Sequence, residues 1–262
     1  MYPLRASAPL PTLIGAVAGT DQRLPFRAQA FEDPRSRTAE EFADRLVRNK
    51  MALEAVYQGE VMLLAPDIFP FYYALVSDQR PEQPPKTRRG AQSALTEHAF
   101  RAITDRGALT RDDLIEQLGG ALSESAMDRV LQDLRAALKI ARTVGGSEAG
   151  EKWDLYLRLA PEAIQQGRYM SEPEALSAII SKYLDCAIAA SKQEIEDFIA
   201  PIAARSRVAE LLKTLTNARH FRQISDGTNS WFALAHPSAR PDNAKREPRR
   251  TPITSSRSRS NG

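Results

Sequence analysis

Two stretches of this sequence share the same order of pattern elements, and that repetition limits the folds open to the chain. Residues 95–157 contain three segments with helical apolar spacing, followed by two short segments typical of strands. Residues 172–235 repeat this series in the same order. Three helices and a β-hairpin can bury their apolar faces in one small core. The repetition therefore predicts two consecutive modules of related architecture.

The first copy has residues that start or stop a helix at its predicted boundaries. Leu95 and Ile103 belong to one apolar helix face. Thr110 and Ser123 can cap the free backbone N–H groups at the starts of two further helices. Glycines that favour turns and helix ends stand at Gly107, Gly119 and Gly120. Three helices are therefore expected before residue 139.

The second copy opens two of its helices with capping boxes, in which a serine and a glutamate three residues later satisfy each other's backbone groups. Ser171 and Glu174 form the first box, and Ser191 and Glu194 form the second. A third apolar stripe at helical spacing follows Pro201. Three helices are expected again.

Each copy ends in two extended segments whose pattern predicts a β-hairpin. The four predicted strands are residues 140–144, 153–157, 221–224 and 231–235. A glycine-rich loop at 145–150 joins the first pair, and a turn containing Gly227 joins the second. We expect Trp153 and Trp231 to occupy equivalent core positions in the two hairpins.

Three helices followed by a hairpin is the order of a winged-helix domain, in which a short helix turns tightly into a longer one. The predicted fold class is therefore mainly α with short β-hairpins (α+β), built from tandem winged-helix modules. The first module is placed at residues 92–168 and the second at residues 169–235.

The N-terminal part has weaker signals. Residues 1–37 are rich in Pro, Ala and Arg without a period, and we expect an irregular arm. Residues 38–77 are predicted to form a helix-strand-helix element. Its first helix opens at a Thr38–Glu41 capping box and extends to Tyr57. A strand at 61–64 and an aromatic helical turn at 67–75 complete it.

Proline and charge mark the two segments that connect or follow the modules. Residues 78–91 are predicted to be a proline-rich linker. Residues 236–262 have no apolar period and are predicted to be a disordered basic tail. The tail carries seven basic and two acidic residues, so the net charge of +3 for the whole chain leaves −2 for residues 1–235. The basic pI therefore does not by itself indicate nucleic-acid binding by the folded part.

The single cysteine and the hydropathy pattern exclude several classes of protein. Cys186 stands alone among apolar residues, so neither a disulfide framework nor a multi-cysteine metal site is possible. No segment is long and apolar enough for a membrane span. We therefore expect a cytoplasmic protein that does not contact a membrane.

Three stretches of the chain resemble one family. They are residues 57–75, residues 137–163 across the first hairpin, and residues 174–184. Over roughly residues 40–235 the chain resembles winged-helix proteins related to bacterial crosslink-repair DNA glycosylases (AlkZ-like). The resemblance implies a winged-helix fold and association with DNA. In active members a Gln-x-Gln pair is implicated in catalysis. No Gln-x-Gln occurs in this sequence, and Gln165–Gln166 has the wrong spacing.

The third helix of each module is the element that a winged helix places in the major groove. Acidic and basic residues nearly cancel among the residues expected to be exposed on that helix in the first module, which include Arg129, Arg135, Glu124, Asp128 and Asp133. The second module instead gathers basic residues there and in its hairpin. The predicted nucleic-acid-binding residues are Arg205, Arg207, Lys213, Arg219, His220 and Arg222.

No group of residues predicts a catalytic centre. His98, His220 and His236 share no metal-ligand spacing, and no glycine-rich phosphate loop occurs between a strand and a helix. We therefore predict no catalytic residue, no metal site and no cofactor.

The preferred hypothesis is a non-catalytic protein that binds DNA, most simply double-stranded DNA, in repair or regulation. One alternative is a DNA glycosylase that acts on alkylated or crosslinked bases. Another is an interaction module that binds a protein partner through the charge-balanced first module.

Overall fold

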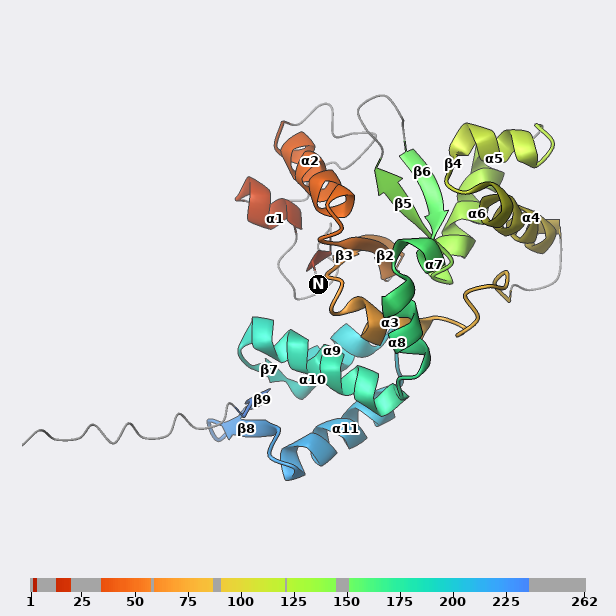
Figure 1. The fold of residues 1–262 in the computed structure, drawn as a ribbon. Coiled ribbons are helices and arrows are strands. Elements are labelled where there is room, and N and C mark those ends of the chain that lie inside the picture. The colour runs from red at the N-terminus through yellow and green to blue at the C-terminus, as the bar shows by residue number, and fades with distance from the viewer. Residues whose placement is uncertain are drawn as a thin grey trace, which may run out of the picture.

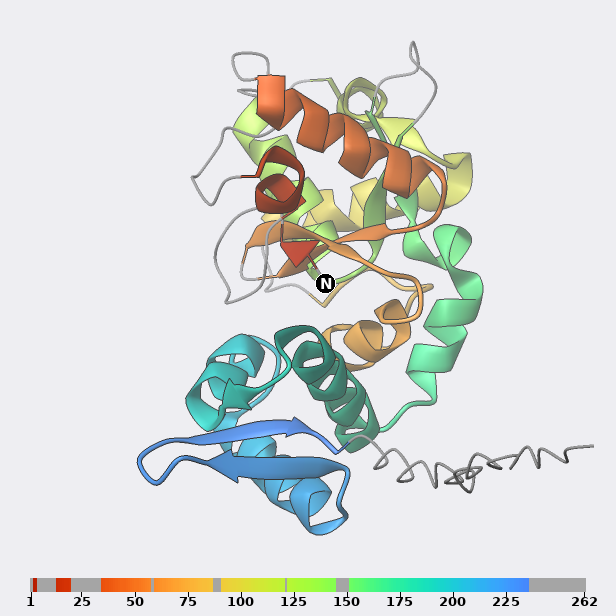
Figure 2. The same cartoon turned by 90° about the vertical axis from the view of Figure 1, so that its left-hand side faces the viewer.

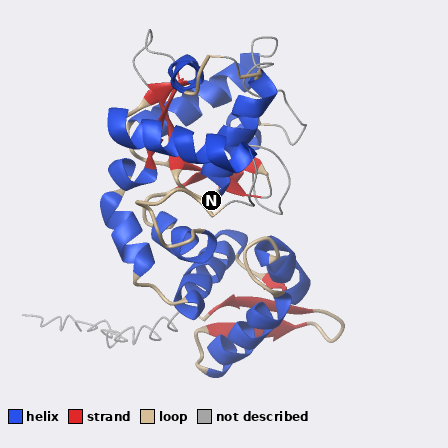
Figure 3. Ribbon diagram, turned by 90° about the vertical axis from the view of Figure 1, so that its right-hand side faces the viewer, coloured by secondary structure: helices blue, strands red, loops and turns tan. Residues whose placement is uncertain are grey.

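The computed structural model describes residues 2–3, 13–19, 34–57, 59–86, 91–120, 122–144 and 151–235. Helices alternate with three small antiparallel sheets, which confirms the α+β class (Figure 3). In Figure 1 the N-terminal elements and the first copy form the upper part, and the second copy forms the lower part. The predicted loop at 145–150 and the predicted tail at 236–262 lie outside the described residues.

The N-terminal part contains a three-stranded sheet in the order β1-β3-β2. Helices α1 and α2 pack against each other, and a small cluster places Leu13 against Ala39, Ala43 and Leu63. Its elements are β1 (Tyr2–Pro3), α1 (Leu13–Ala18), α2 (Pro34–Arg48), β2 (Leu53–Tyr57), β3 (Glu60–Leu64) and α3 (Phe69–Val76).

Two expectations for this part were wrong. The arm at 1–37 is not irregular throughout, because it contains α1 and the first turn of α2. The predicted helix at 38–57 is a helix followed by a strand. It begins at Pro34, and the Thr38 hydroxyl donates to the Pro34 carbonyl (2.9 Å) inside the helix instead of capping its start.

The second half of the predicted helix became β2 because its residues pair with β3. Leu53 and Val56 have a spacing that suits a helix, but both are also good strand formers. Gly59 takes a positive φ of 77°, which lets the chain reverse tightly between β2 and β3. The element at 38–77 is therefore helix, strand, strand and helix.

The two copies have the same element order and the same strand order. The first comprises α4 (Ala91–Arg106), β4 (Leu109–Thr110), α5 (Arg111–Gln117), α6 (Glu124–Ala136), β5 (Ile140–Val144) and β6 (Glu151–Leu155). The second comprises α9 (Glu172–Ala187), β7 (Ala190–Ser191), α10 (Lys192–Ile199), α11 (Arg205–Asn217), β8 (Phe221–Ser225) and β9 (Ser230–Leu234). Their sheets have the orders β4-β6-β5 and β7-β9-β8. All three helices and both hairpin strands predicted for each copy are present. The strand expected at 153–157 lies at Glu151–Leu155 instead, and Tyr156 and Leu157 belong to the following helix.

The expected equivalence of the two tryptophans was wrong by one position. Trp153 pairs with Leu109, whereas Trp231 pairs with Ser191. Because Thr110 and Ser191 both cap the second helix of their copy, the residue equivalent to Trp153 is Phe232. A shift of one residue reverses the face of a strand. Trp153 is accordingly buried in its core, and Trp231 is half-buried.

Part of the predicted linker is held against the first copy. Residues 78–86 form no helix or strand, as expected, whereas Ala91, the last residue of the predicted linker, begins α4. The buried Lys139 ammonium nevertheless donates to Asp78 Oδ1 (2.7 Å) and to the Arg80 carbonyl (2.6 Å). Burial lowers the pKa of Lys139, and Asp78 opposes that change. The start of the segment is therefore fixed to the first copy by these charge-assisted hydrogen bonds.

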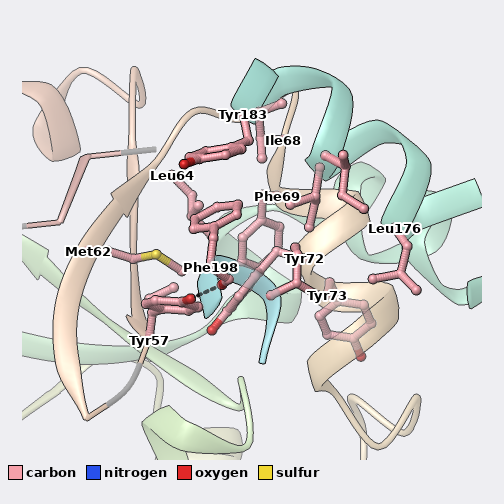
Figure 4. Packing of buried hydrophobic residues seen from close by; sticks show 14 of the residues in the cluster. Tyr57, Met62, Leu64, Ile68, Phe69, Tyr72, Tyr73, Leu176, Tyr183 and Phe198 are labelled. Atoms are coloured by element: carbon pink, nitrogen blue, oxygen red, sulfur yellow. Dashed lines mark hydrogen bonds between the residues drawn. The ribbon is translucent and has the colours of Figure 1, made fainter. Parts of the chain in front are cut away.

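The second copy shares one hydrophobic core with the N-terminal part. Helices α7 (Tyr156–Leu159) and α8 (Pro161–Arg168) connect the copies, and α3 packs against α8 and α9. Figure 4 shows the aromatic residues of this core, including Tyr183 stacked on Phe198 with ring centroids 4.5 Å apart. The first copy keeps a separate core of its own.

Three buried tyrosine hydroxyls fasten β2 to distant parts of the chain. Tyr72 Oη donates to the Val56 carbonyl (2.5 Å), and Tyr156 Oη donates to the Glu54 carbonyl. The hydroxyl of Tyr57, on β2 itself, donates to the carbonyl of Phe198 in α10 (Figure 4). Burial raises the pKa of Tyr72 and of Tyr156, so both phenols remain protonated donors. These bonds link β2 to α3, α7 and α10.

The close approach of α8 to α3 requires a glycine. A Cβ on Gly167 would lie 2.7 Å from the Pro70 carbonyl oxygen, which belongs to rigid helix backbone. We predict that Gly167→Ala lowers the free energy of unfolding by about 1–3 kcal/mol through overpacking. At an uncrowded helix position the same change would raise it by about 0.5–1 kcal/mol. Chemical denaturation of Gly167→Ala measures the sign of the change in the free energy of unfolding. Gln166→Ala, at the exposed neighbour, should change stability by less than about 0.5 kcal/mol.

A strained residue ends α9. Ile188 has φ 67° and ψ −51°, and the Ala189 N–H donates to the Ala187 carbonyl (2.7 Å), which defines a γ-turn with a positive φ at its centre. The equivalent residue of the first copy, three positions before the capping residue, is Gly107 with φ 93°. The equivalent position, with a positive φ in both copies, therefore holds glycine in one copy and a β-branched residue in the other.

We predict that Ile188→Gly raises the free energy of unfolding by about 1 kcal/mol, because it relieves backbone strain. The isoleucine side chain is 81% exposed, so its loss removes little burial. The reciprocal Gly107→Ile change should destabilise, although no atom lies within 4 Å of the added Cβ. Urea denaturation of both variants tests this. A loss of stability from Ile188→Gly would mean that the side chain makes a contact worth more than the strain.

Candidate nucleic-acid interface

Helix α11 and the β8–β9 hairpin carry all six predicted nucleic-acid-binding residues. Val208 and Leu212 fasten the helix to the core, which leaves its opposite face in solvent. Figure 2 shows the hairpin in front with α11 behind it at one end of the molecule. The six residues are all exposed: Arg205, Arg207, Lys213, Arg219, His220 and Arg222.

Two of the six have acidic partners. Arg205 Nη2 lies 2.9 Å from Asp197 Oδ1, and Arg207 Nη1 lies 3.5 Å from Glu210 Oε2. Exposed pairs of this kind contribute little to stability. They nevertheless neutralise much of the local field that would attract a phosphate.

Arg207 also lines a groove that does not suit a polyanion. The groove has a volume of about 340 Å³ and lies between α11 and the start of α9. Glu172 and Glu210 line it beside Arg207, with Leu176 and Leu211 as apolar members. Two carboxylates against one guanidinium would repel phosphate.

Lys213 lies in a different hollow, which is basic. This hollow has a volume of about 240 Å³ and lies between α11, the start of α10 and the hairpin. Its polar lining includes Lys192, Asn217 and Gln223, and Phe232 is among its apolar residues. Lys192 has a partner in Glu196 at 3.4 Å. Lysines and side-chain amides together can contact phosphates and base edges.

Arg219, His220 and Arg222 follow the end of α11. Arg219 adopts a positive φ of 58° beyond the helix, and the His220 carbonyl accepts the Ala235 N–H (2.9 Å). Arg222 is on β8, where its side chain points away from the face that carries Gln223. In the part of the chain that the structure describes, neither these three residues nor Lys213 forms an ion pair.

The corresponding helix of the first copy is charge-balanced, as its sequence predicted. Arg111 lies 2.5 Å from Asp128, so one acid of α6 is already paired. Arg135 was expected to be exposed, but its side chain is only 21% exposed. It lies 5.2 Å from the centre of the Trp153 ring and 3.9 Å from Glu54. Its charge is therefore turned inward.

The sequence interpretation missed a buried ion cluster centred on Arg142. Glu54 Oε1 accepts from Arg142 Nε (2.9 Å) and Nη2 (2.5 Å), and both side chains are almost fully buried. Arg142 Nη2 also donates to Asp44 (2.5 Å), and its Nη1 donates to Glu151 (3.2 Å). The cluster joins α2, β2, β5 and β6. Its members are spread over about a hundred residues, so no local spacing could have revealed it.

The charge state of this cluster follows from its geometry. Burial alone lowers the pKa of Arg142, but the neighbouring charges of Glu54 and Asp44 more than offset that effect, and the pKa lies above its ordinary value. The guanidinium therefore stays charged and bridges the N-terminal part to the first copy. Within the described segments, no group of three His, Cys, Asp or Glu side chains could hold a metal ion.

Comparison with known families matches this chain to one model. The family is described as DNA glycosylase AlkZ-like, and the match covers residues 24–253. The chain belongs to this family. The resemblance expected from residues 57–75, 137–163 and 174–184 is thereby confirmed, and the matched region extends beyond it at both ends.

A solved structure supports the fold of this AlkZ-like chain. Streptomyces sahachiroi DNA glycosylase AlkZ is similar with a TM-score of 0.53 and 16% sequence identity. The alignment covers 74% of this chain and 55% of that one, so the chain spans about half the length of the structure it matches. No curated protein matches. The likeness establishes a shared fold.

In the described part of this AlkZ-like chain, no helix has the length and apolar character to cross a bilayer.

Proposed function

We propose that this AlkZ-like chain binds double-stranded DNA in a role connected with DNA repair, and that residues 92–168 and 169–235 are tandem winged-helix modules. One observation carries the proposal. Four exposed basic residues without an acidic partner among the described residues follow one another along α11 and the start of the hairpin. They are Lys213, Arg219, His220 and Arg222.

Winged-helix geometry gives this surface a physical role. The third helix of such a module enters the major groove, which is wide enough for a helix, and the hairpin contacts the backbone beside it. The hollow at the α11–hairpin junction brings Lys213 and Gln223 together. Lysine supplies affinity through phosphate contacts, and an amide can discriminate between base edges.

The double variant Lys213→Gln/Arg222→Gln tests this surface. Each phosphate contact on duplex DNA contributes a slope of about −0.9 to the dependence of log affinity on log salt. We predict weaker binding and a slope reduced by roughly 1–2. Fluorescence anisotropy with a labelled duplex at several salt concentrations measures both.

A matched control uses the two arginines that have acidic partners. Arg205→Gln/Arg207→Gln removes the same total charge from the same module, but from Asp197 and Glu210. Its effect on the salt slope should be clearly smaller. A larger effect from this control would move the interface toward the α11 surface that carries Arg205 and Arg207, beside the groove between α11 and α9. Wild-type protein that does not bind DNA would refute the proposal and favour a protein partner for the charge-balanced first module.

DNA glycosylase activity is a second candidate, supported by family membership. The chain lacks the Gln-x-Gln pair, so cleavage of a glycosidic bond would need other residues. We predict no base release from duplexes that contain an alkylated base or an interstrand crosslink, measured by mass spectrometry at enzyme excess over hours. Release above the spontaneous rate would show that the chain is an enzyme. A catalytically active family member is the positive control.

A further inference from the structure

The C-terminal end of α2 presents a second group of uncompensated basic residues. Arg45, Arg48 and Lys50 are exposed, and in the described part of the chain none of them forms an ion pair. Lys50 stands at a positive φ of 56°, just beyond the end of the helix. A helix C-terminus favours nearby cations, which explains why they are tolerated there but leaves their charge in solvent.

The Arg142 cluster explains why Arg48 has no ion pair with Asp44 on its own helix. Asp44 and Arg48 stand four residues apart on α2, the spacing at which opposite charges usually pair. Asp44 Oδ1 instead accepts from Arg142 Nη2 (2.5 Å). Glu54 and Glu151 are also bound to Arg142. The carboxylate at the pairing distance along the helix from Arg48, that of Asp44, is therefore already bound to Arg142.

These residues surround a small hollow that we call the α2 notch. It has a volume of about 160 Å³ and is lined by exposed Arg48 and Lys50 and by buried Arg142. Glu54 is its one acidic member, and Thr143 supplies a hydroxyl. Its apolar members are Val47, Leu53, Ala141, Val144 and Leu159. Because Arg142 is already bound to Glu54, Asp44 and Glu151, the positive charge of the notch comes from Arg48 and Lys50.

The size and lining of the notch restrict its ligand. Small-molecule sites usually have volumes of about 300–1,000 Å³, so this hollow is too small for a whole nucleotide. A phosphodiester group needs only cationic donors, and the attached sugar can lie against apolar side chains. Arg48 and Lys50 are exposed at the C-terminal end of α2, where the backbone of a nucleic-acid duplex can approach them.

We propose that the α2 notch binds a backbone phosphate of nucleic acid, as a contact site separate from the α11–hairpin surface. The inference rests on the proposed DNA-binding function and adds residues of the N-terminal part to the interface. Arg48 and Lys50 contact the phosphate. Arg142 acts as a positioning residue, because it holds away the acids that would otherwise neutralise Arg48.

The test compares two double variants that lose the same charge. Arg48→Gln/Lys50→Gln should weaken binding to a 30-base-pair duplex and reduce the salt slope by roughly 1, since one phosphate contact contributes about 0.9. The control is Arg101→Gln/Arg168→Gln, which removes two exposed arginines that are paired with Glu97 and Glu82. The control should leave the slope almost unchanged. Thermal unfolding of both variants verifies that each remains folded.

Equal slopes for the two variants would overturn the notch proposal. The DNA-binding proposal would survive that result if the Lys213→Gln/Arg222→Gln variant still loses affinity, so the two failures are distinguishable. NMR titration with inorganic phosphate at constant ionic strength separates free phosphate from DNA. Saturable shifts of the Thr143 and Val144 amides, lost in the notch variant without any change in its DNA slope, would assign the notch to a free anion and overturn the proposal.

Discussion

Burial of the Glu54 carboxylate in β2 is the constraint on which the rest of the structure depends. An ionised carboxylate away from water is stable only when it is paired and hydrogen-bonded. Arg142 supplies two of those bonds from β5, and Arg135 adds its charge from α6. The carbonyl of the same residue accepts from Tyr156. One strand residue thus ties the N-terminal part to the first copy at both its side chain and its backbone.

Neighbouring residues of β2 extend this arrangement to the second copy. Val56 accepts from Tyr72 of α3, and Tyr57 donates to Phe198 of α10. These bonds lie inside one continuous apolar core, where each hydroxyl must find a partner. The two repeated copies are therefore not independent domains. The N-terminal part and the second copy share a core, to which the first copy contributes Leu138 and Ala141, and the first copy is also joined to them through ion pairs and tyrosine hydroxyls.

Whether each basic side chain has an acidic partner, more than the number of basic residues, distinguishes the surfaces of this chain that carry net positive charge. Arg207 and Lys213 are both exposed on α11, yet Glu210 neutralises the first and no described acid pairs with the second. Arg142 occupies the acids near α2 in the same manner and frees Arg48. Membership in the AlkZ-like family is consistent with either surface meeting DNA, because a shared fold does not assign a site.

The sequence alone determined the repeated order of elements, because apolar periodicity and capping residues act locally. Thr110, Ser171 and Ser191 cap the helices that they were expected to cap, and both hairpins are present, although the strand expected at 153–157 is shifted to 151–155. Family membership also followed from short packing motifs. The candidate residues on α11 were likewise found from the local excess of Arg and Lys.

Only the tertiary structure decided the features that depend on distant partners. Residues 53–57 became a strand because β3 offers them backbone bonds that a helix continuing from α2 would forgo. A one-residue register difference put Phe232, instead of Trp231, in the place of Trp153. Whether a basic residue has an ion pair depends on residues far along the chain. Asp44 pairs with Arg142, 98 residues away, and not with Arg48 on its own helix. Ion pairs form across space, and a sequence records only the order along the chain.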